Sequence, residues 1–402
     1  MSTVVETATF ARADAPAAAR RPRLDAVDLL RGLVIALMVL DHTRDFFHAQ
    51  AFTLNPTDPA RTTLVLYLTR WAANLCAPTF VFLAGVSIEL QRANGKTPAE
   101  LSRFLLTRGL WLIALELTVV GFGFNFAWPF AFLQVIWAIG LGMVAMAALT
   151  RLPRAAVLAL GALIVAGHDA LDSVRAGDLG AFAPLWTLAM ALGPAPFGTG
   201  FVAYPFVPWF GILCLGYGLG PVFLRPAGQR RRLTALLGVG CLALFVVLRF
   251  VNGYGDPSPW HAQAEGWRTA LAFFDVGKYP PSLLYVLVML GTSLLLALGL
   301  ERLRGPLADA LLAYGRTPLF TYLLHIYLVH GLAMAIGMAT GVPASAFRNF
   351  IADPSRLVAL HWGFGLPVVY AIWLAVLAAL YPASRWYARL KRQRHARWMS
   401  YL

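Results

Sequence analysis

The chain has 402 residues, of which 59% are hydrophobic and only 13% charged, and its formal net charge is +14 at pH 7. Soluble globular proteins carry about 25% charged residues, so this composition excludes a large soluble domain and indicates a multi-pass membrane protein. The basic residues lie in loops, without the aromatic interleaving or the motifs of a nucleic-acid-binding protein. The positive charge therefore predicts contact with anionic membrane lipids and not with nucleic acid.

Ten segments are long and apolar enough to cross a bilayer, which predicts an all-α, polytopic transmembrane helical bundle. The predicted spans are 27–47, 63–90, 104–121, 127–149, 155–171, 203–224, 233–251, 280–300, 318–339 and 357–381. Residues 182–200 are also apolar, but Pro184, Pro194 and Pro196 interrupt them. They predict an outer-face loop or a re-entrant piece, and an eleventh span is the alternative.

The placement of Lys and Arg predicts the orientation of this bundle. With the N-terminus inside, the predicted inner segments hold 23 of the 33 basic residues and the predicted outer segments hold 7. This excess predicts that both termini are cytoplasmic. An eleventh span would move residues 225–232, with four arginines, to the outer side, which favours ten. The predicted organisation is a disordered N-terminal tail (1–23), a transmembrane domain (24–384) and a basic C-terminal tail (385–402).

Ionisable residues gather at the two ends of the first span. Its inner end carries Asp28 and Arg31, and its outer end carries Asp41, His42, Arg44, Asp45 and His48. Charged groups inside a span are costly and often mark function. A carboxylate beside an imidazole raises its basicity, as a general base or acyl acceptor requires; the alternative is an ion-paired helix end at the membrane surface. Arg31 and His42 fall on one helix face, separated by a rise of about 16 Å.

Sequence pieces along nearly the whole chain, taken in order, resemble one family of membrane enzymes. They are VDLLRG and RDFFH around the first span, APTFVFLAGVS (77–87), SRFLLTRGLWL (102–112), FLQVIWAIG (132–140), KYPPSLLY (278–285) and GRTPLFTYLLHIYLVH (315–330). The chain resembles the heparan-α-glucosaminide N-acetyltransferase-like family of integral membrane acyltransferases, especially its bacterial members. The resemblance implies a multi-pass acyltransferase of the bacterial cytoplasmic membrane.

The resemblance implies two alternative catalytic histidines. In the lysosomal relative, a histidine after the first helix serves in acetyl transfer from acetyl-CoA, with an asparagine nearby; His48 and Asp41 match these two by order. A related membrane O-acyltransferase family carries an arginine and a histidine with ten residues between them in its first helix, and Arg31 and His42 match that spacing. Both histidines remain candidates, with Asp41 and Asp45 beside them.

The implied reaction moves an acyl group, acetyl in the first instance, from cytoplasmic acyl-CoA to an acceptor at the outer face, with a cell-envelope sugar as one candidate. Arg103, Arg108 and Arg316, each where a loop enters a helix, are candidates to bind the CoA phosphates; the alternative for each is ordinary inside-loop charge. Arg31, within the first helix and close in sequence to Asp28, is the favoured candidate. Polar residues at the depth of the histidines are candidates to complete the cavity: Arg44, Arg70, Asn74, Glu116, Asn125, Gln134, Lys278 and His325.

No metal site is expected, because the other histidines have no metal-ligand spacing and no HExxH motif is present. The three cysteines are far apart and form no CxxC pair. The expected partners are membrane lipids and acyl-CoA. The sequence does not decide whether the protein is a monomer or a homodimer. The alternative function from another class is a proton-coupled secondary transporter.

Overall fold

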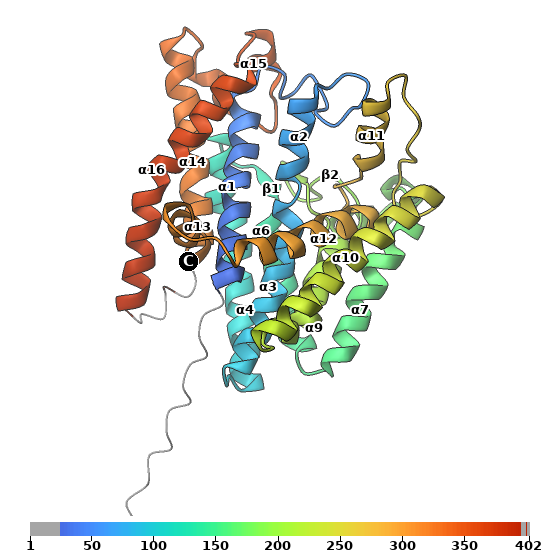
Figure 1. Cartoon of the computed structure of the whole chain (residues 1–402). Coiled ribbons are helices and arrows are strands. Elements are labelled where there is room, and N and C mark those ends of the chain that lie inside the picture. The colour runs from blue at the N-terminus through green and yellow to red at the C-terminus, as the bar shows by residue number, and fades with distance from the viewer. Residues whose placement is uncertain (1–24, 395–398, 400–402) are drawn as a thin grey trace, which may run out of the picture.

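The computed structural model describes residues 25–394 and 399, and these form an α-helical bundle with one small sheet (Figure 1). The predicted tail 1–23 lies outside the described residues. The main helices are α1 (Asp25–Phe47), α2 (Leu64–Ala73), α3 (Cys76–Ala93), α4 (Pro98–Leu115), α5 (Gly121–Asn125), α6 (Val135–Leu149), α7 (Arg154–Gly167), α8 (Ala183–Ala189), α9 (Phe206–Phe223), α10 (Ala227–Val251), α11 (Gly266–Phe274), α12 (Leu283–Leu300), α13 (Pro306–Arg316), α14 (Pro318–Ala339), α15 (Ser355–Ala359) and α16 (Leu366–Gln393).

Eight helical segments of the described chain are long and apolar enough to cross a membrane. They are Leu64–Ala93, Pro98–Asn125, Arg154–Leu171, Phe206–Phe223, Ala227–Val251, Leu283–Leu300, Pro318–Ala339 and Leu366–Gln393. Two further predicted spans correspond to α1, which carries several charged residues, and α6, which has only 15 residues. The predicted all-α, multi-pass membrane architecture is confirmed.

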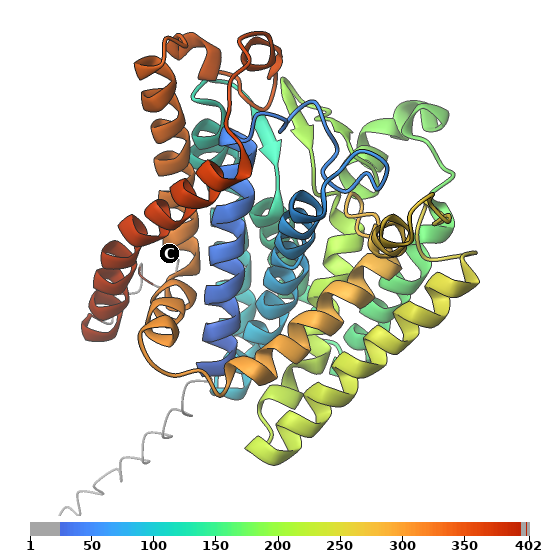
Figure 2. The ribbon, with the colours of Figure 1, turned by 45° about the horizontal axis from the view of Figure 1, so that its top comes forward.

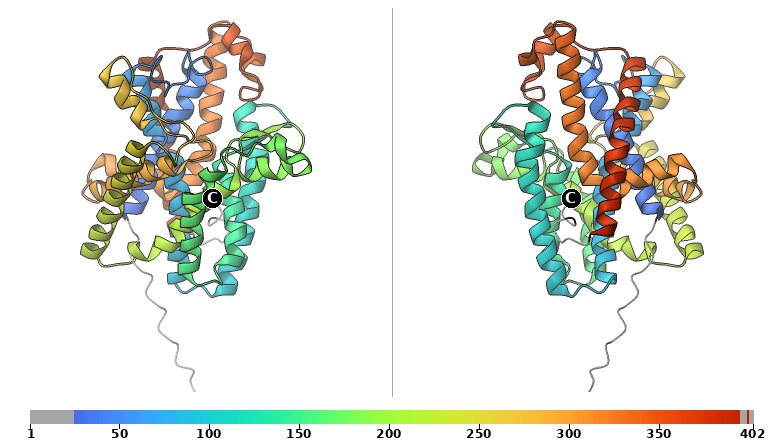
Figure 3. Two further views of the ribbon diagram at one scale, coloured as in Figure 1. Left: turned by 90° about the vertical axis from the view of Figure 1, so that its right-hand side faces the viewer. Right: turned by 90° about the vertical axis from the view of Figure 1, so that its left-hand side faces the viewer.

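Helix α1 lies inside the bundle, where it can contact most of the other elements. It packs against α13, α14 and α16 on one side and against α2, α3 and α12 on the other, as Figure 2 shows. Figure 3 shows α15 at one end of the bundle and the connection between α3 and α4 at the opposite end. We call the end of α1 near Asp28 the inner end and the end near Asp41 the outer end, following the predicted orientation.

The predicted span 63–90 is two helices, α2 and α3, with a break at Asn74 and Leu75. The break follows from Pro78, which has no backbone N–H to donate to the carbonyl of Asn74 four residues earlier. That carbonyl instead accepts a hydrogen bond of 2.7 Å from the Tyr285 hydroxyl of α12. The break therefore ties α3 to α12 in the middle of the bundle.

The predicted span 127–149 begins too early. Helix α6 starts only at Val135, and Ala131–Leu133 form strand β1, which pairs in parallel with β3 (Gly200–Val202); β2 (Gly193–Pro194) pairs antiparallel with β3. The start of α6 is set by the Glu116 carboxylate, which accepts hydrogen bonds from the backbone N–H groups of Gln134 and Trp137, both at 3.1 Å. A buried carboxylate at a helix N-terminus satisfies donors that have no partner within the helix.

Residues 182–200 hold the short helix α8 and strand β2. At about 1.5 Å per residue, the seven residues of α8 extend about 10 Å, too little to cross a bilayer. This agrees with the expected loop or re-entrant piece.

The expected inner loop 301–317 contains α13, which the apolar pattern missed because the helix is short. Helix α13 lies directly against α1. A Cβ at Gly32 would lie 1.9 Å from the Leu311 carbonyl oxygen, and one at Gly315 would lie 1.8 Å from the Asp28 carbonyl oxygen. Only glycine permits this approach, which brings Arg316 to the inner end of α1. Helix α16 likewise continues to Gln393, beyond the predicted end at 381.

Candidate functional site

Two large cavities lie along α1, one toward each end of the helix. The outer cavity has a volume of about 680 Å³ and is lined by Asp41, His42, Arg44 and Asp45 of α1. The inner cavity has a volume of about 620 Å³ and is lined by Arg31 and Ile35 of the same helix. The two cavities share four lining residues, Met38, Phe80, Val135 and Tyr322, which we call the neck. One helix thus serves both cavities, and the neck separates them.

His42 of the outer cavity is hydrogen-bonded to His325 of α14, with 2.7 Å between His42 Nδ1 and His325 Nε2. The two rings are stacked, with centroids 5.0 Å apart, and Phe124 packs edge-on against His42. His325 Nδ1 lies 3.2 Å from the Thr321 carbonyl oxygen, which can only accept. For a neutral His325, its Nδ1 therefore carries the proton, and His42 Nδ1 donates to His325 Nε2. This leaves His42 Nε2 as the basic nitrogen.

The Asp41 carboxylate pairs with two arginines, one on α2 and one on α1. Its carboxylate oxygens each lie 2.7 Å from Arg70 Nη1 of α2, and Arg44 Nη2 lies 3.2 Å from the same group. Arg44 also bonds Asp45. The Asp41 side chain is only 12% exposed, so its charge depends on the two arginines for compensation. This ion cluster holds α1 against α2 beside His42.

His48, the other candidate histidine, lies just after the end of α1. Its backbone forms a bridge with Phe364, and its Nδ1 accepts a 3.3 Å hydrogen bond from the backbone N–H of Gln50. Burial and the nearby Arg44 lower the pKa of His48, so it is neutral at pH 7. Within the described residues, His48 is not part of the lining of the outer cavity.

Basic side chains surround the inner cavity. They are Arg31, Lys96, Arg108, Arg316 and Lys391. Arg31 Nη1 donates to Asp28 at 3.2 Å, and Arg316 Nη2 donates to Asp25 at 3.1 Å. Lys96 was not among the predicted residues, because it lies in the connection between α3 and α4, and Lys391 was placed in a tail. Both join the cavity through tertiary packing alone.

The structure brings some of the predicted cavity residues together and leaves others elsewhere. The outer cavity gathers Arg70, Asn74, Gln134 and Lys278 along with the α1 residues. As far as the described chain defines the two linings, they do not include the following predicted residues: Arg103, Glu116, Asn125 and His325. His325 is completely buried behind His42.

Each of the other three has a different position. Arg103 is exposed on α4, and Glu116 caps α6 as described above. Asn125 Oδ1 accepts a 3.0 Å hydrogen bond from the backbone of Ile351, so Asn125 holds a loop whose Ile351 lines the outer cavity. These polar residues stabilise the walls of the site without facing its interior.

Three tyrosines in the lining, Tyr204, Tyr279 and Tyr322, were not predicted. Tyr322 belongs to the neck, and Tyr279 lies beside Lys278, whose ammonium is 4.9 Å from its ring centre. Tyr322 falls three residues before His325 in the printed sequence, so helical spacing from that histidine could have identified it. Within the residues that the structure describes, no group of three or more His, Cys, Asp or Glu side chains could hold a metal ion.

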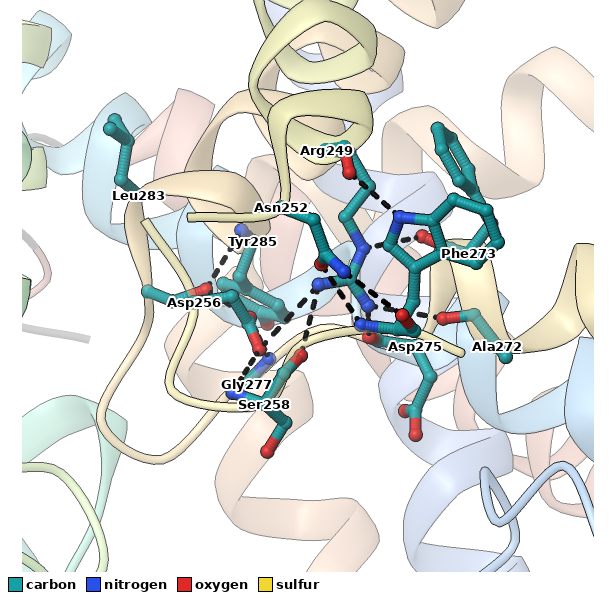
Figure 4. Close-up of polar contacts among 12 residues, drawn as sticks. Arg249, Asn252, Asp256, Ser258, Ala272, Phe273, Asp275, Gly277, Leu283 and Tyr285 are labelled. Atoms are coloured by element: carbon teal, nitrogen blue, oxygen red, sulfur yellow. Dashed lines mark hydrogen bonds and ion pairs between the residues drawn. The ribbon is translucent and has the colours of Figure 1, made fainter. Parts of the chain in front are cut away.

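The rim of the outer cavity is held by Arg249 at the end of α10 (Figure 4). Its guanidinium is 2% exposed and donates to four backbone carbonyls, those of Ser258, Ala272, Phe273 and Asp275, at 2.6–3.1 Å. The segment that follows α11 carries Asp275 and Lys278 into the cavity. Burial raises the pKa of the Asp275 carboxyl to about 6. Arg249 therefore fixes the segment on which these charged groups lie.

Arg249 Nη1 also lies 3.8 Å from the buried Asp256 carboxylate. Replacing Arg249 with methionine is expected to lower the free energy of unfolding by about 3–5 kcal/mol, because Asp256 loses its charged partner. Thermal unfolding of the purified protein in detergent measures this. The control is Arg232→Met, an exposed position on the same helix, where a change within about 0.5 kcal/mol is expected. Equal melting temperatures for the two variants would contradict the role of Arg249.

Comparison with known proteins identifies the family. The family model described as heparan-alpha-glucosaminide N-acetyltransferase, catalytic, matches residues 23–248. A search of curated proteins finds no match. The matched region contains Arg31, His42 and Gln134, whereas Lys278, Tyr322 and His325 lie beyond it. The match covers more than half of the chain, which therefore belongs to the heparan-alpha-glucosaminide N-acetyltransferase catalytic-domain family.

Proposed function

We propose that the protein transfers an acetyl group from acetyl-CoA, bound in the inner cavity, to an acceptor in the outer cavity, with His42 as the general base. Family membership makes the chain an acetyltransferase-type membrane enzyme. The observation that carries the finer proposal is the arrangement along α1. Arg31 lines the inner cavity, His42 lines the outer cavity, and Met38 lies in the neck between them.

The charge of the inner cavity supports acyl-CoA as the donor. CoA carries several phosphate charges and cannot enter hydrocarbon, so its nucleotide has to remain near an aqueous mouth. Five basic side chains line this cavity, and arginine binds phosphate oxygens in a bidentate manner. The apolar lining, including Ile35, Ile139 and Met143, offers a path for the thin pantetheine arm toward the neck.

The hydrogen bonding of His42 supports its role as base. His42 Nε2 is the nitrogen left free to accept a proton when Nδ1 donates to His325. Once His42 is protonated, the neutral His325 continues to accept from its Nδ1–H. A base whose other nitrogen is held by the same hydrogen bond before and after it takes up a proton keeps its orientation, which suits general base catalysis.

In the proposed step, the acceptor oxygen or nitrogen forms a bond to the thioester carbonyl carbon, and its proton passes to His42 Nε2. The carbonyl electron pair moves to oxygen and then returns as the carbon–sulfur bond breaks. The CoA thiolate leaves and receives the proton from His42. The polar lining of the outer cavity, with carboxylates, arginines and Lys278, fits a polyhydroxylated acceptor such as a sugar of the cell envelope.

The direct test uses the purified protein with acetyl-CoA, and with glucosamine as the probe acceptor. We expect acetyl-CoA to raise the melting temperature, because a ligand that binds only the folded state stabilises it, and we expect CoA thiol to be released faster when glucosamine is present. If millimolar acetyl-CoA neither stabilises the protein nor releases CoA, the proposal is wrong. Proton-dependent solute uptake into vesicles under those conditions would favour the transporter alternative.

The position of the CoA phosphates is tested by two arginines that the sequence analysis named as candidates, Arg31 and Arg103. Arg31→Gln is expected to raise the KM for acetyl-CoA about 10- to 100-fold, the value of one charge-assisted hydrogen bond. Arg103→Gln, on the exposed surface of α4, is expected to change KM less than about twofold. Equal effects of the two substitutions would indicate a general influence of surface charge and would contradict donor binding in the inner cavity.

A further inference from the structure

We infer that the oxyanion site of this transferase lies at the outer side of the neck and is formed by the Tyr322 hydroxyl of the neck and the Gln134 side-chain amide of the outer cavity. This inference rests on the proposed function and adds to it the groups that stabilise the negative charge formed on the thioester oxygen. It follows from two buried hydrogen-bond donors that have no acceptor among the described residues, one in the neck and one in the lining of the outer cavity next to Val135 of the neck.

Tyr322 is the first of these donors. It is 3% exposed, and its hydroxyl has no hydrogen-bond partner among residues 25–394 and 399. Buried polar groups nearly always have a partner, and other buried tyrosines in this bundle follow that rule. Tyr67, Tyr285 and Tyr314 donate to backbone carbonyls at 2.7–2.9 Å. The hydroxyls of Tyr322 and Tyr387 are exceptions, and Tyr322, unlike Tyr387, is located in the lining of both cavities.

Gln134 is the second donor. It is 8% exposed, and its Nε2 also has no partner within the described chain. Its backbone N–H is held by the Glu116 carboxylate at 3.1 Å, which fixes the residue at the start of α6. Gln134 lines the outer cavity, and the next residue, Val135, belongs to the neck. The buried Glu116 therefore acts as a positioning residue for this donor.

Tyr322 lies close to the proposed base, and Gln134 lines the same cavity as that base. The Tyr322 ring centre is 5.5 Å from that of His325, which is hydrogen-bonded to His42. A thioester presented from the inner cavity passes Tyr322 before its carbonyl carbon reaches the acceptor beside His42. Donors placed in advance, with no competing acceptor, stabilise the developing oxyanion without reorganisation.

The charge balance of the step requires such a site. When the acceptor attacks, its proton goes to His42 Nε2 and the carbonyl electron pair becomes a negative charge on oxygen. Tyr322 and Gln134 each donate one hydrogen bond to that oxygen and lose no proton. The bonds weaken again when the carbonyl re-forms and the CoA thiolate leaves. Because these bonds are strongest in the transition state, removing them lowers kcat more than it raises KM.

The test is Tyr322→Phe, which removes only the hydroxyl. We expect kcat for CoA release from acetyl-CoA with glucosamine to fall about 100- to 1,000-fold, with the KM for acetyl-CoA within about threefold of wild type. The matched control is Tyr387→Phe on α16, another buried hydroxyl without a described partner, where kcat should stay within about twofold. Gln134→Leu should lower kcat in the same way, and melting temperatures show whether each variant is folded.

The outcomes separate the inference from the proposed function. If the wild type neither binds acetyl-CoA nor releases CoA, the proposed function fails, and the oxyanion site fails with it. If the wild type is active and folded Tyr322→Phe retains the kcat of Tyr387→Phe, only the oxyanion site is wrong. A rise in KM without a fall in kcat would make Tyr322 a donor-binding residue and would also overturn the inference.

Discussion

Replacing His42 with alanine is expected to lower kcat for acetyl transfer about 1,000-fold or more, with little change in the KM for acetyl-CoA. A positioned general base contributes about 100- to 10,000-fold to the rate, and His42 lines the cavity in which the acceptor is proposed to bind. The measurement is CoA release with glucosamine as the acceptor, at several concentrations of acetyl-CoA.

The matched control is His48→Ala, which tests the other histidine that the resemblance implied. Its side chain lies outside the described lining of the outer cavity and accepts a hydrogen bond from a neighbouring backbone N–H. We expect kcat to change less than about fivefold, since the lost interaction is a local one. Loss of activity in His48→Ala with full activity in His42→Ala would reverse the assignment and would place the chemistry beyond the end of α1.

The second large effect is expected for Asp41→Ala, which should lower the free energy of unfolding by about 3–5 kcal/mol. The substitution leaves Arg70 and Arg44 without the carboxylate between them, and an unpaired charge in a buried position is strongly destabilising. Asp41→Asn keeps the size of the side chain and separates the loss of charge from the loss of packing. Thermal unfolding in detergent, followed by a buried tryptophan signal, reports the change.

Asp45→Asn provides the comparison for this prediction. The Asp45 side chain is 33% exposed, and solvent-screened ion pairs contribute about 0–1 kcal/mol. We therefore expect Asp45→Asn to unfold within a few degrees of the wild type. If Asp41→Asn is as stable as Asp45→Asn, the Asp41–Arg70 pair does not hold α1 against α2.

The sequence determines the membrane architecture, because the signal is local and strong. A run of about 20 apolar residues has to cross the bilayer as a helix, and the predicted span 318–339 coincides with α14. The face shared by Arg31 and His42 also follows from the sequence, since 3.6 residues per turn sets it within a single helix. Both residues line cavities along α1, as that face predicts.

Elements that depend on neighbours in space were predicted less well. Helix α13 is 11 residues long, too short for an apolar window, and is stabilised by its close contact with α1. The start of α6 depends on Glu116, which lies 18 residues before Gln134 in the sequence. A hydropathy profile shows Glu116 only as a charged residue inside a span. In both cases the deciding contact is absent from the local sequence pattern.

The sequence by itself determined that this protein is a helical membrane bundle whose first helix has a cation at one end and an imidazole at the other. Only the tertiary structure decided what surrounds those groups. His42 meets His325 across 283 residues of chain, Asp41 meets Arg70 of another helix, and the Tyr322 hydroxyl is buried without a partner in the described part of the chain. Helical periodicity orients a side chain on its own helix, whereas its partner is chosen by how helices pack against one another.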